Sequence, residues 1–129
     1  MPLIRPIIRH ITCDNVFEDL RKYRPPDPHA FSLQLSLAIG SQDDEDEAAD
    51  NFYIIVGTPK WLESAVADGD IVNGRHKLFI REYDIDRILK YMEDYVASCV
   101  GTTWEDVAVK IGRSLQWEFE DYQERKPET

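Results

Sequence analysis

Three histidines and two cysteines are the residues best suited to metal binding or nucleophilic chemistry, and they are scattered along the chain. His10, His29 and His76 form no HxxxH or HExxH pattern, and Cys13 and Cys99 form no CxxC pair. Zinc sites are usually built on such closely spaced pairs. We therefore predict no metal and no cofactor, with both cysteines reduced and each histidine a surface or partly buried residue.

A second candidate for chemistry is the lysine in residues 57–60 (GTPK). A lysine near a helix start is typical of phosphate-binding loops, but the glycine-rich stretch is missing and Pro59 has no amide to donate. A helix cap followed by a surface lysine is the favoured interpretation. No GxSxG motif is present, and carboxylate pairs are expected by chance among 25 acidic residues. We therefore predict that the chain is not an enzyme.

Acidic residues dominate the charge of the chain: 25 of them face 15 basic residues, and the formal net charge is −10. Nucleic-acid binders carry a basic footprint, and anionic membranes attract basic segments. We therefore expect neither nucleic acid nor a membrane as a partner.

The densest acidic run lies between positions 43 and 50 and consists of Asp43, Asp44, Glu45, Asp46, Glu47 and Asp50. An EF-hand calcium loop alternates its ligands and needs a glycine at its sharp turn, and this run has neither. Like charges packed so densely repel one another and stay solvated. Residues 41–50 are therefore predicted to form an exposed, mobile hairpin loop.

Length and composition set the class of protein. The chain has 129 residues, of which 43% are hydrophobic, which suits one domain over residues 1–129. No apolar run reaches the roughly 18 residues that a membrane-spanning helix needs. Prolines and arginines interrupt the N-terminal apolar stretch, unlike in a signal peptide. We expect a cytoplasmic protein with a frayed tail at residues 123–129.

Patterns of period two predict the strands. In residues 31–39 every second side chain is apolar, which is typical of a strand with one buried face. Residues 3–12 indicate a strand at a sheet edge or with a bulge, because Pro6 lacks an amide donor. Residues 52–56 are apolar on both faces and predict a central strand. Residues 76–83 predict a further strand.

Patterns of helical period predict three helices. One begins at Pro59 after a Thr58 cap. A second follows an Asp84 cap and runs to about residue 100. A third starts with the capping-box spacing of Thr102 and Glu105 and ends near residue 112. Residues 115–119 alternate like a strand, and a continued helix is the competing assignment.

This order of elements predicts the fold class. Strands come first and helices later, without regular βαβ alternation, which favours an α+β fold. We expect a mainly antiparallel sheet of about 4–5 strands with two or three helices packed on one face. Trp61, Trp104 and Trp117 fall where helix or strand periodicity directs side chains inward, so we expect them in the core and not on a recognition surface.

Four segments together resemble the immunity protein 8 family. They are residues 23–40 (YRPPDPHAFSLQLSLAIG), 51–64 (NFYIIVGTPKWLES), 74–88 (GRHKLFIREYDIDRI) and 102–122 (TTWEDVAVKIGRSLQWEFEDY). The most specific pieces are residues 58–62 (TPKWL), 74–76 (GRH) and 117–122 (WEFEDY). The resemblance implies a bacterial cytoplasmic protein, encoded beside a secreted polymorphic toxin, that binds the toxin domain and blocks it. It implies no catalytic residues, and its motifs fall mainly on positions that form the fold.

The acidic loop lies outside these motifs, which makes it a candidate for partner-specific recognition, or else a solvated insertion. A toxin that acts on nucleic acid has a basic cleft, towards which an anionic protein is steered. We therefore predict that a toxin, with a nuclease as one option, is contacted by Asp43, Asp44, Glu45, Asp46, Glu47 and Asp50, joined by Asp68 and Asp70.

Two alternatives stay open: an adaptor that docks by sheet-edge addition at residues 3–12 or 115–119, and a small enzyme of unrecognised type. The sequence leaves open the identity of the toxin and the oligomeric state.

Overall fold

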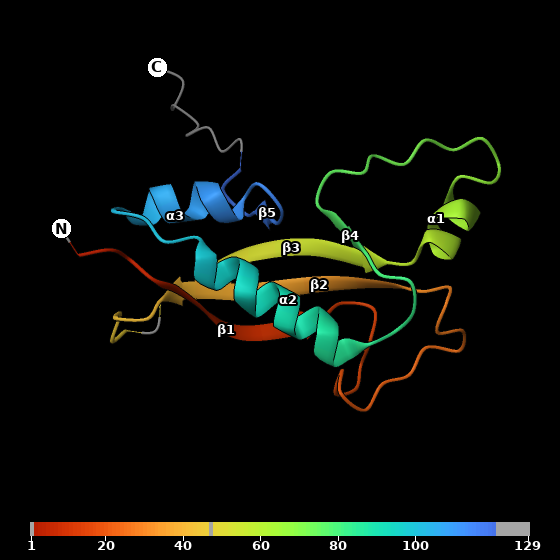
Figure 1. The fold of residues 1–129 in the computed structure, drawn as a ribbon, viewed down its shortest axis with the longest axis horizontal. Helices are drawn as coiled ribbons and strands as arrows, with labels where there is room; N and C mark the ends of the chain where they lie inside the picture. Colours follow the sequence, from red (N-terminus) through yellow and green to blue (C-terminus); the bar gives the residue numbers. More distant parts are fainter. Residues whose placement is uncertain (1, 47, 121–129) are drawn as a thin grey trace, which may run out of the picture.

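A five-stranded mixed sheet forms the centre of the structure, a computed structural model that describes residues 2–46 and 48–120 (Figure 1). The strands are β1 (Pro6–Cys13), β2 (Ser32–Ser41), β3 (Asp50–Gly57), β4 (Lys77–Phe79) and β5 (Gln116–Trp117). The helices are α1 (Pro59–Ala65), α2 (Ile85–Ser98) and α3 (Trp104–Ile111). The predicted α+β class is confirmed; the predicted frayed tail at residues 123–129 lies outside the described residues.

The first three strands form an antiparallel meander, β1–β2–β3. The alternation that predicted β2 is also its burial pattern: the side chains exposed by at most 1% are Leu33, Leu35, Leu37 and Ile39. β1 lies at the sheet edge, and its register shifts between Ile8 and His10. Both the edge position and the bulge that Pro6 indicated are therefore present.

The other side of β3 is shared by two short strands. β4 pairs in parallel with residues 55–57, and β5 pairs antiparallel with Phe52 and Tyr53. The strand predicted over residues 76–83 is thus only three residues long. The chain leaves the sheet where β3 ends. Ile80 N still donates to O of Gly57, the last residue of β3, but Tyr83 N donates to Pro28 O outside the sheet. Strand, and not helix, is the correct assignment for residues 116–117.

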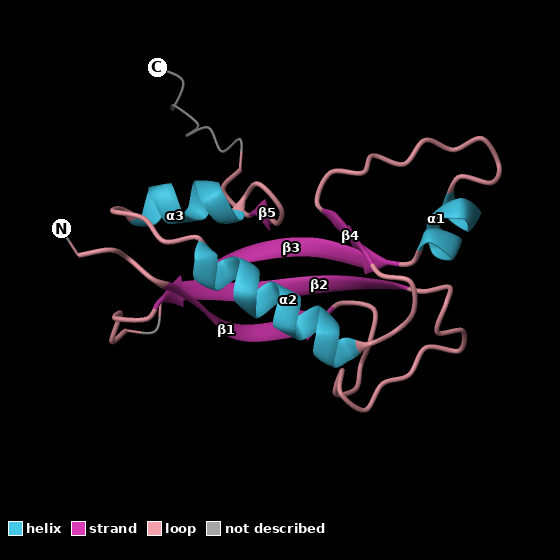
Figure 2. Cartoon of the chain, viewed as in Figure 1, coloured by secondary structure: helices cyan, strands magenta, loops and turns pink. Residues whose placement is uncertain are grey.

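Two of the helices supply apolar residues to one core. α2 lies across one face of the sheet (Figure 2), and its buried side chains are Ile85, Ile88, Met92 and Val96. α3 contributes Val107, Ala108 and Ile111. Its N-cap is Thr103 and not Thr102, because the Thr103 side chain accepts from Asp106 N at 3.1 Å. Across the described residues, none of the helices is both long and apolar enough to span a membrane.

α1 differs from the other two helices, because it buries none of its residues completely. It stands beside the ends of β3 and β4 and not over the middle of the sheet (Figure 1). Trp61 is therefore only partly buried and does not lie in the core as predicted. Trp104 and Trp117 pack against the core, as predicted.

The opposite face of the sheet is open to solvent. The side chains between the buried ones on β1, β2 and β3 point to this face, and those exposed there are Ile7, His10, Thr12, Gln34, Asn51 and Tyr53. Tyr53 lies near the middle of the face and is 39% exposed. The sheet therefore has one face covered by helices and one available to a partner.

Candidate functional site

The acidic connection, residues 41–50, joins β2 to β3, so the predicted hairpin is confirmed. Its exposed acidic residues are Asp43, Glu45 and Asp46, while Asp44 and Asp50 are partly buried. Glu47 lies outside the described residues. The mobility of the acidic connection stays a prediction.

Arg9 holds the acidic connection against β1. Its Nη2 atom donates to Ser41 O at 2.6 Å and to Asp44 O at 3.4 Å. Within the connection, Asp44 Oδ1 accepts from Asp46 N at 3.0 Å. The guanidinium of the bulged residue is thus turned towards main-chain oxygens of the connection, which leaves the outer carboxylates facing water.

Asp50 has a different role from the rest of the run. Its Oδ2 atom accepts from Trp104 Nε1 at 2.6 Å and from Trp117 Nε1 at 3.0 Å. A packed indole N–H needs an acceptor, and this carboxylate supplies one for two indoles at once. Asp50 therefore ties β3 to α3 and β5; its part in toxin contact stays a prediction. The sequence held a signal for this role, since two tryptophans expected in the core each required an acceptor.

Asp68 and Asp70 are exposed in the connection that follows α1. In Figure 1 this connection lies at the opposite end of the sheet from the acidic connection. The predicted contact residues therefore form two separate groups. A single small epitope cannot include both.

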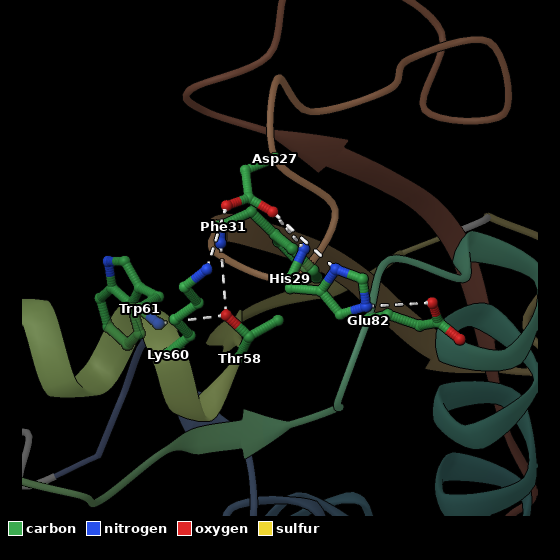
Figure 3. Close-up of polar contacts among 7 residues, drawn as sticks. All are labelled: Asp27, His29, Phe31, Thr58, Lys60, Trp61 and Glu82. Atoms are coloured by element: carbon green, nitrogen blue, oxygen red, sulfur yellow. Dashed lines mark hydrogen bonds and ion pairs between the residues drawn. The ribbon is translucent and has the colours of Figure 1, made fainter.

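The motif at residues 58–62 fastens two segments of the fold (Figure 3). Thr58 Oγ1 accepts from Trp61 N at 3.2 Å, which caps α1, and from Phe31 N at 3.3 Å. Thr58 N in turn donates to Phe31 O at 3.2 Å. Thr58 is completely buried, so this threonine has a structural role in joining β2 to α1.

Charged residues extend this cluster at the surface (Figure 3). The Asp27 carboxylate lies 3.7 Å from Lys60 Nζ, and His29 Nε2 lies 3.4 Å from Glu82 Oε2. His29 N donates to Asp27 Oδ1, and this bond, helped by the charge of Lys60, lowers the pKa of Asp27. These side chains are about half exposed, so solvent screens their ion pairs. The cluster orients the loop before β2.

The motif at residues 74–76 also joins two distant segments of the fold. His76 has a φ of 57°, and its ring atoms Nδ1 and Nε2 lie 3.3 Å from Ser114 O and 3.2 Å from Glu120 Oε2. Arg75 reaches the same carboxylate at 3.1 Å. The start of β4 is thereby joined to the segment around β5. Both motifs support the fold, as the resemblance implied.

A groove of about 760 Å³ runs along the outer side of β1. Its walls are β1, residues 16–21 and α2, and Gln42 of the acidic connection also lines it. Phe17 on the loop wall is completely exposed, and Ile7 on β1 is 40% exposed. The sequence placed a strand here but gave no sign of the groove, because its walls come from three distant segments.

The remaining candidates for chemistry stay apart. Within the part of the chain that the structure describes, no three His, Cys, Asp or Glu side chains are grouped to hold a metal ion. Cys13 and Cys99 are free thiols, and burial raises the pKa of Cys13 above its ordinary value. His10, His29 and His76 lie in separate parts of the molecule.

The structure is thus a small α+β fold in which two sequence motifs hold segments together. Its acidic connection is exposed, and a groove follows one edge of its sheet. The family model of immunity protein 8 matches residues 7–122, and the chain belongs to this family. Its members neutralise a cognate toxin and are not enzymes, which confirms the predicted family, class of function and protein partner. No curated protein and no solved structure matches the chain.

Proposed function

We propose that this immunity protein acts in the cytoplasm of the bacterium that makes it, by covering a basic functional surface of its toxin. A nuclease is the class of toxin that fits best, because its substrate is a polyanion. The observation that carries the proposal is the net charge of −10 together with the exposed carboxylates of Asp43, Glu45 and Asp46, which lie outside the fold-forming motifs.

Complementary charge affects both the rate and the affinity of binding. Opposite net charges accelerate encounter, and salt reduces this acceleration. Complexes between nucleases and their inhibitors reach dissociation constants of about 10⁻¹³–10⁻¹⁶ M without any chemical step. An inhibitor that occupies the phosphate-binding surface therefore needs only complementary charge and a well-packed contact.

The test uses the toxin domain encoded beside the chain and a variant of the acidic connection, D43N/E45Q/D46N/E47Q. The variant spares Asp44 and Asp50, whose carboxylates accept hydrogen bonds. We expect slower association by about tenfold at low salt and a flatter dependence of the rate on salt concentration. Stopped-flow or surface-plasmon measurements give both quantities.

The matched control removes the same number of charges elsewhere, from exposed positions outside the groove and the acidic connection, as E63Q/E82Q/D94N/E105Q. If both variants slow association equally, net charge matters and the acidic connection has no special part. If neither does, the electrostatic proposal is wrong. Co-expression tests the function itself, since the wild-type chain should rescue growth of cells that produce the toxin domain.

A further inference from the structure

The outer side of β1 is a free strand edge. Among the residues that the structure describes, β1 pairs only with β2, whereas β4 and β5 pair with the far side of β3. Asp14 N donates to Gln34 O of β2. Residues along an antiparallel strand alternately direct their N–H and C=O groups towards and away from the neighbouring strand. The main-chain groups of Thr12 and His10 therefore point to β2, and those of Ile11 point outward. Free main-chain donors and acceptors at a sheet edge can pair with a further strand.

We propose that the groove beside this edge binds an extended segment of the cognate toxin, which adds to β1 as a further strand. The proposal rests on toxin neutralisation as the function and names the surface that performs it. Strand addition gains affinity from main-chain hydrogen bonds and specificity from pockets for alternate side chains. The edge of β1 supplies the main-chain hydrogen-bonding groups, and the groove supplies the space for side chains.

Apolar side chains on all three walls favour an occupant with apolar residues at alternate positions. Ile8 and Ile11 line the β1 wall on the helix-covered face, Leu89 lines the α2 wall and Phe17 lines the loop wall. Phe17 is completely exposed, and an exposed phenyl ring has interaction value here because other apolar side chains line the same groove. Contact with a bound segment would remove this ring from water.

Charge complementarity selects a basic segment. The two arginines in the lining are engaged: Arg9 binds the acidic connection, and Arg21 lies 3.6 Å from Asp86. Three exposed acids of the lining, Glu18, Asp19 and Glu93, have no ion pair within the described residues. A lysine or arginine of the incoming segment would therefore find unpaired carboxylates on the loop and helix walls.

The groove is continuous with the surface that the previous proposal uses. Gln42 lines the groove, and Arg9 joins β1 to the acidic connection. The acidic connection can therefore accelerate the approach of a basic toxin, while the groove holds the bound segment. Association rate and dissociation rate are then set by neighbouring but different residues.

A second copy of the chain fits the groove less well. Each copy carries a net charge of −10, so two copies repel one another. The regular part of the edge is also short, because Pro6 has no amide and the bulge interrupts the register after Ile8. Pairing over so few residues buries less area than a stable dimer needs, whereas a toxin segment would also contact the loop and helix walls of the groove.

Two substitution variants test the proposal against the toxin domain encoded beside the chain. Phe17→Ala combined with Glu93→Lys changes two exposed side chains of the groove and should leave the fold intact. We expect the dissociation constant to rise at least about tenfold, mainly through faster dissociation. The control is Tyr91→Ala, which removes a half-exposed aromatic side chain of α2 outside the groove lining and should bind as the wild type does.

The second variant, Ile11→Pro, removes an outward main-chain donor while sparing the hydrogen bonds to β2. Weaker binding with a native circular dichroism spectrum is expected. Amide hydrogen exchange provides a readout that does not depend on mutants: the Ile11 amide should become protected in the complex.

The outcomes separate the inference from the function on which it rests. If the wild-type chain neither binds the toxin domain nor rescues cells, the proposed function is wrong. If the wild type binds but the groove variants bind equally well and Ile11 exchange is unchanged, only the groove proposal is overturned. A dimer of the free chain that dissociates on Ile11→Pro would assign the edge to a second copy and would also overturn it.

Discussion

Replacing Asp50 with alanine should destabilise the fold more than any other single change in the acidic connection. The change removes the acceptor of two indole N–H groups at 2.6 and 3.0 Å. A hydrogen bond to a charged group contributes about 1.5–3 kcal/mol, so two such bonds set an upper limit of about 6 kcal/mol. Both indoles are only partly buried, and water can replace part of the loss. We expect a decrease in the free energy of unfolding of about 2–4 kcal/mol.

The assay is urea unfolding followed by far-ultraviolet circular dichroism, because tryptophan fluorescence changes with the mutation itself. Asp50→Asn keeps one oxygen acceptor and should lose about half as much. Asp43→Ala is the matched control, since its carboxylate is exposed, and it should change the free energy of unfolding by less than about 0.5 kcal/mol.

A double-mutant cycle isolates the hydrogen bond itself. Trp117→Phe removes one of the two donors, so the loss from Asp50→Ala should be smaller by about 1 kcal/mol in the Trp117→Phe background. Equal unfolding midpoints for Asp50→Ala and Asp43→Ala would refute the reasoning. Strict additivity of Asp50→Ala and Trp117→Phe would show that the carboxylate stabilises the fold by some other means.

Two further predictions concern the fastened loops. Thr58→Ala removes the cap of α1 and the acceptor of the buried Phe31 N, and should cost about 2–3 kcal/mol in urea unfolding, whereas Thr58→Ser should cost less than half of that. Burial raises the pKa of Tyr83, whose hydroxyl donates to Leu20 O, from its ordinary value of 10.0 to about 12. The neutral phenol is thus favoured by folding, so its contribution is complete below pH 10.0 and is lost as the pH rises towards about 12. Tyr83→Phe should flatten the fall of stability in that interval; an unchanged slope would contradict the assignment.

The sequence predicted those parts of the fold whose burial follows a simple period. β2 and α2 each have one buried face, so their apolar residues repeat with period two and with helical period. β4 could not be predicted so well. Residues 76–83 alternate like a longer strand, but β3 ends at Gly57 and offers no further partner. A pattern within one segment carries no information about the length of its neighbour.

Part of the candidate site could likewise be predicted from the sequence, and part could not. The run of charge at residues 43–50 is evident in the sequence, and so is the edge position that Pro6 indicated. The separate role of Asp50 depends on Trp104 and Trp117, which lie far along the chain. The exposure of Phe17 depends on how residues 16–21 lie against β1 and α2. Both features arise from tertiary contacts, which local periodicity does not encode.

The late position of β5 in the chain has a consequence for biosynthesis. A ribosome releases residues in order, so β1, β2 and β3 can pair soon after residue 57 has emerged, whereas Phe52 and Tyr53 wait for residues 116 and 117. During that interval the nascent chain carries a second unpaired strand edge, which is a site for misassembly with other nascent chains. Protection of the cell should therefore begin only with chains elongated beyond Trp117, and a nonsense codon shortly before it should leave no active inhibitor.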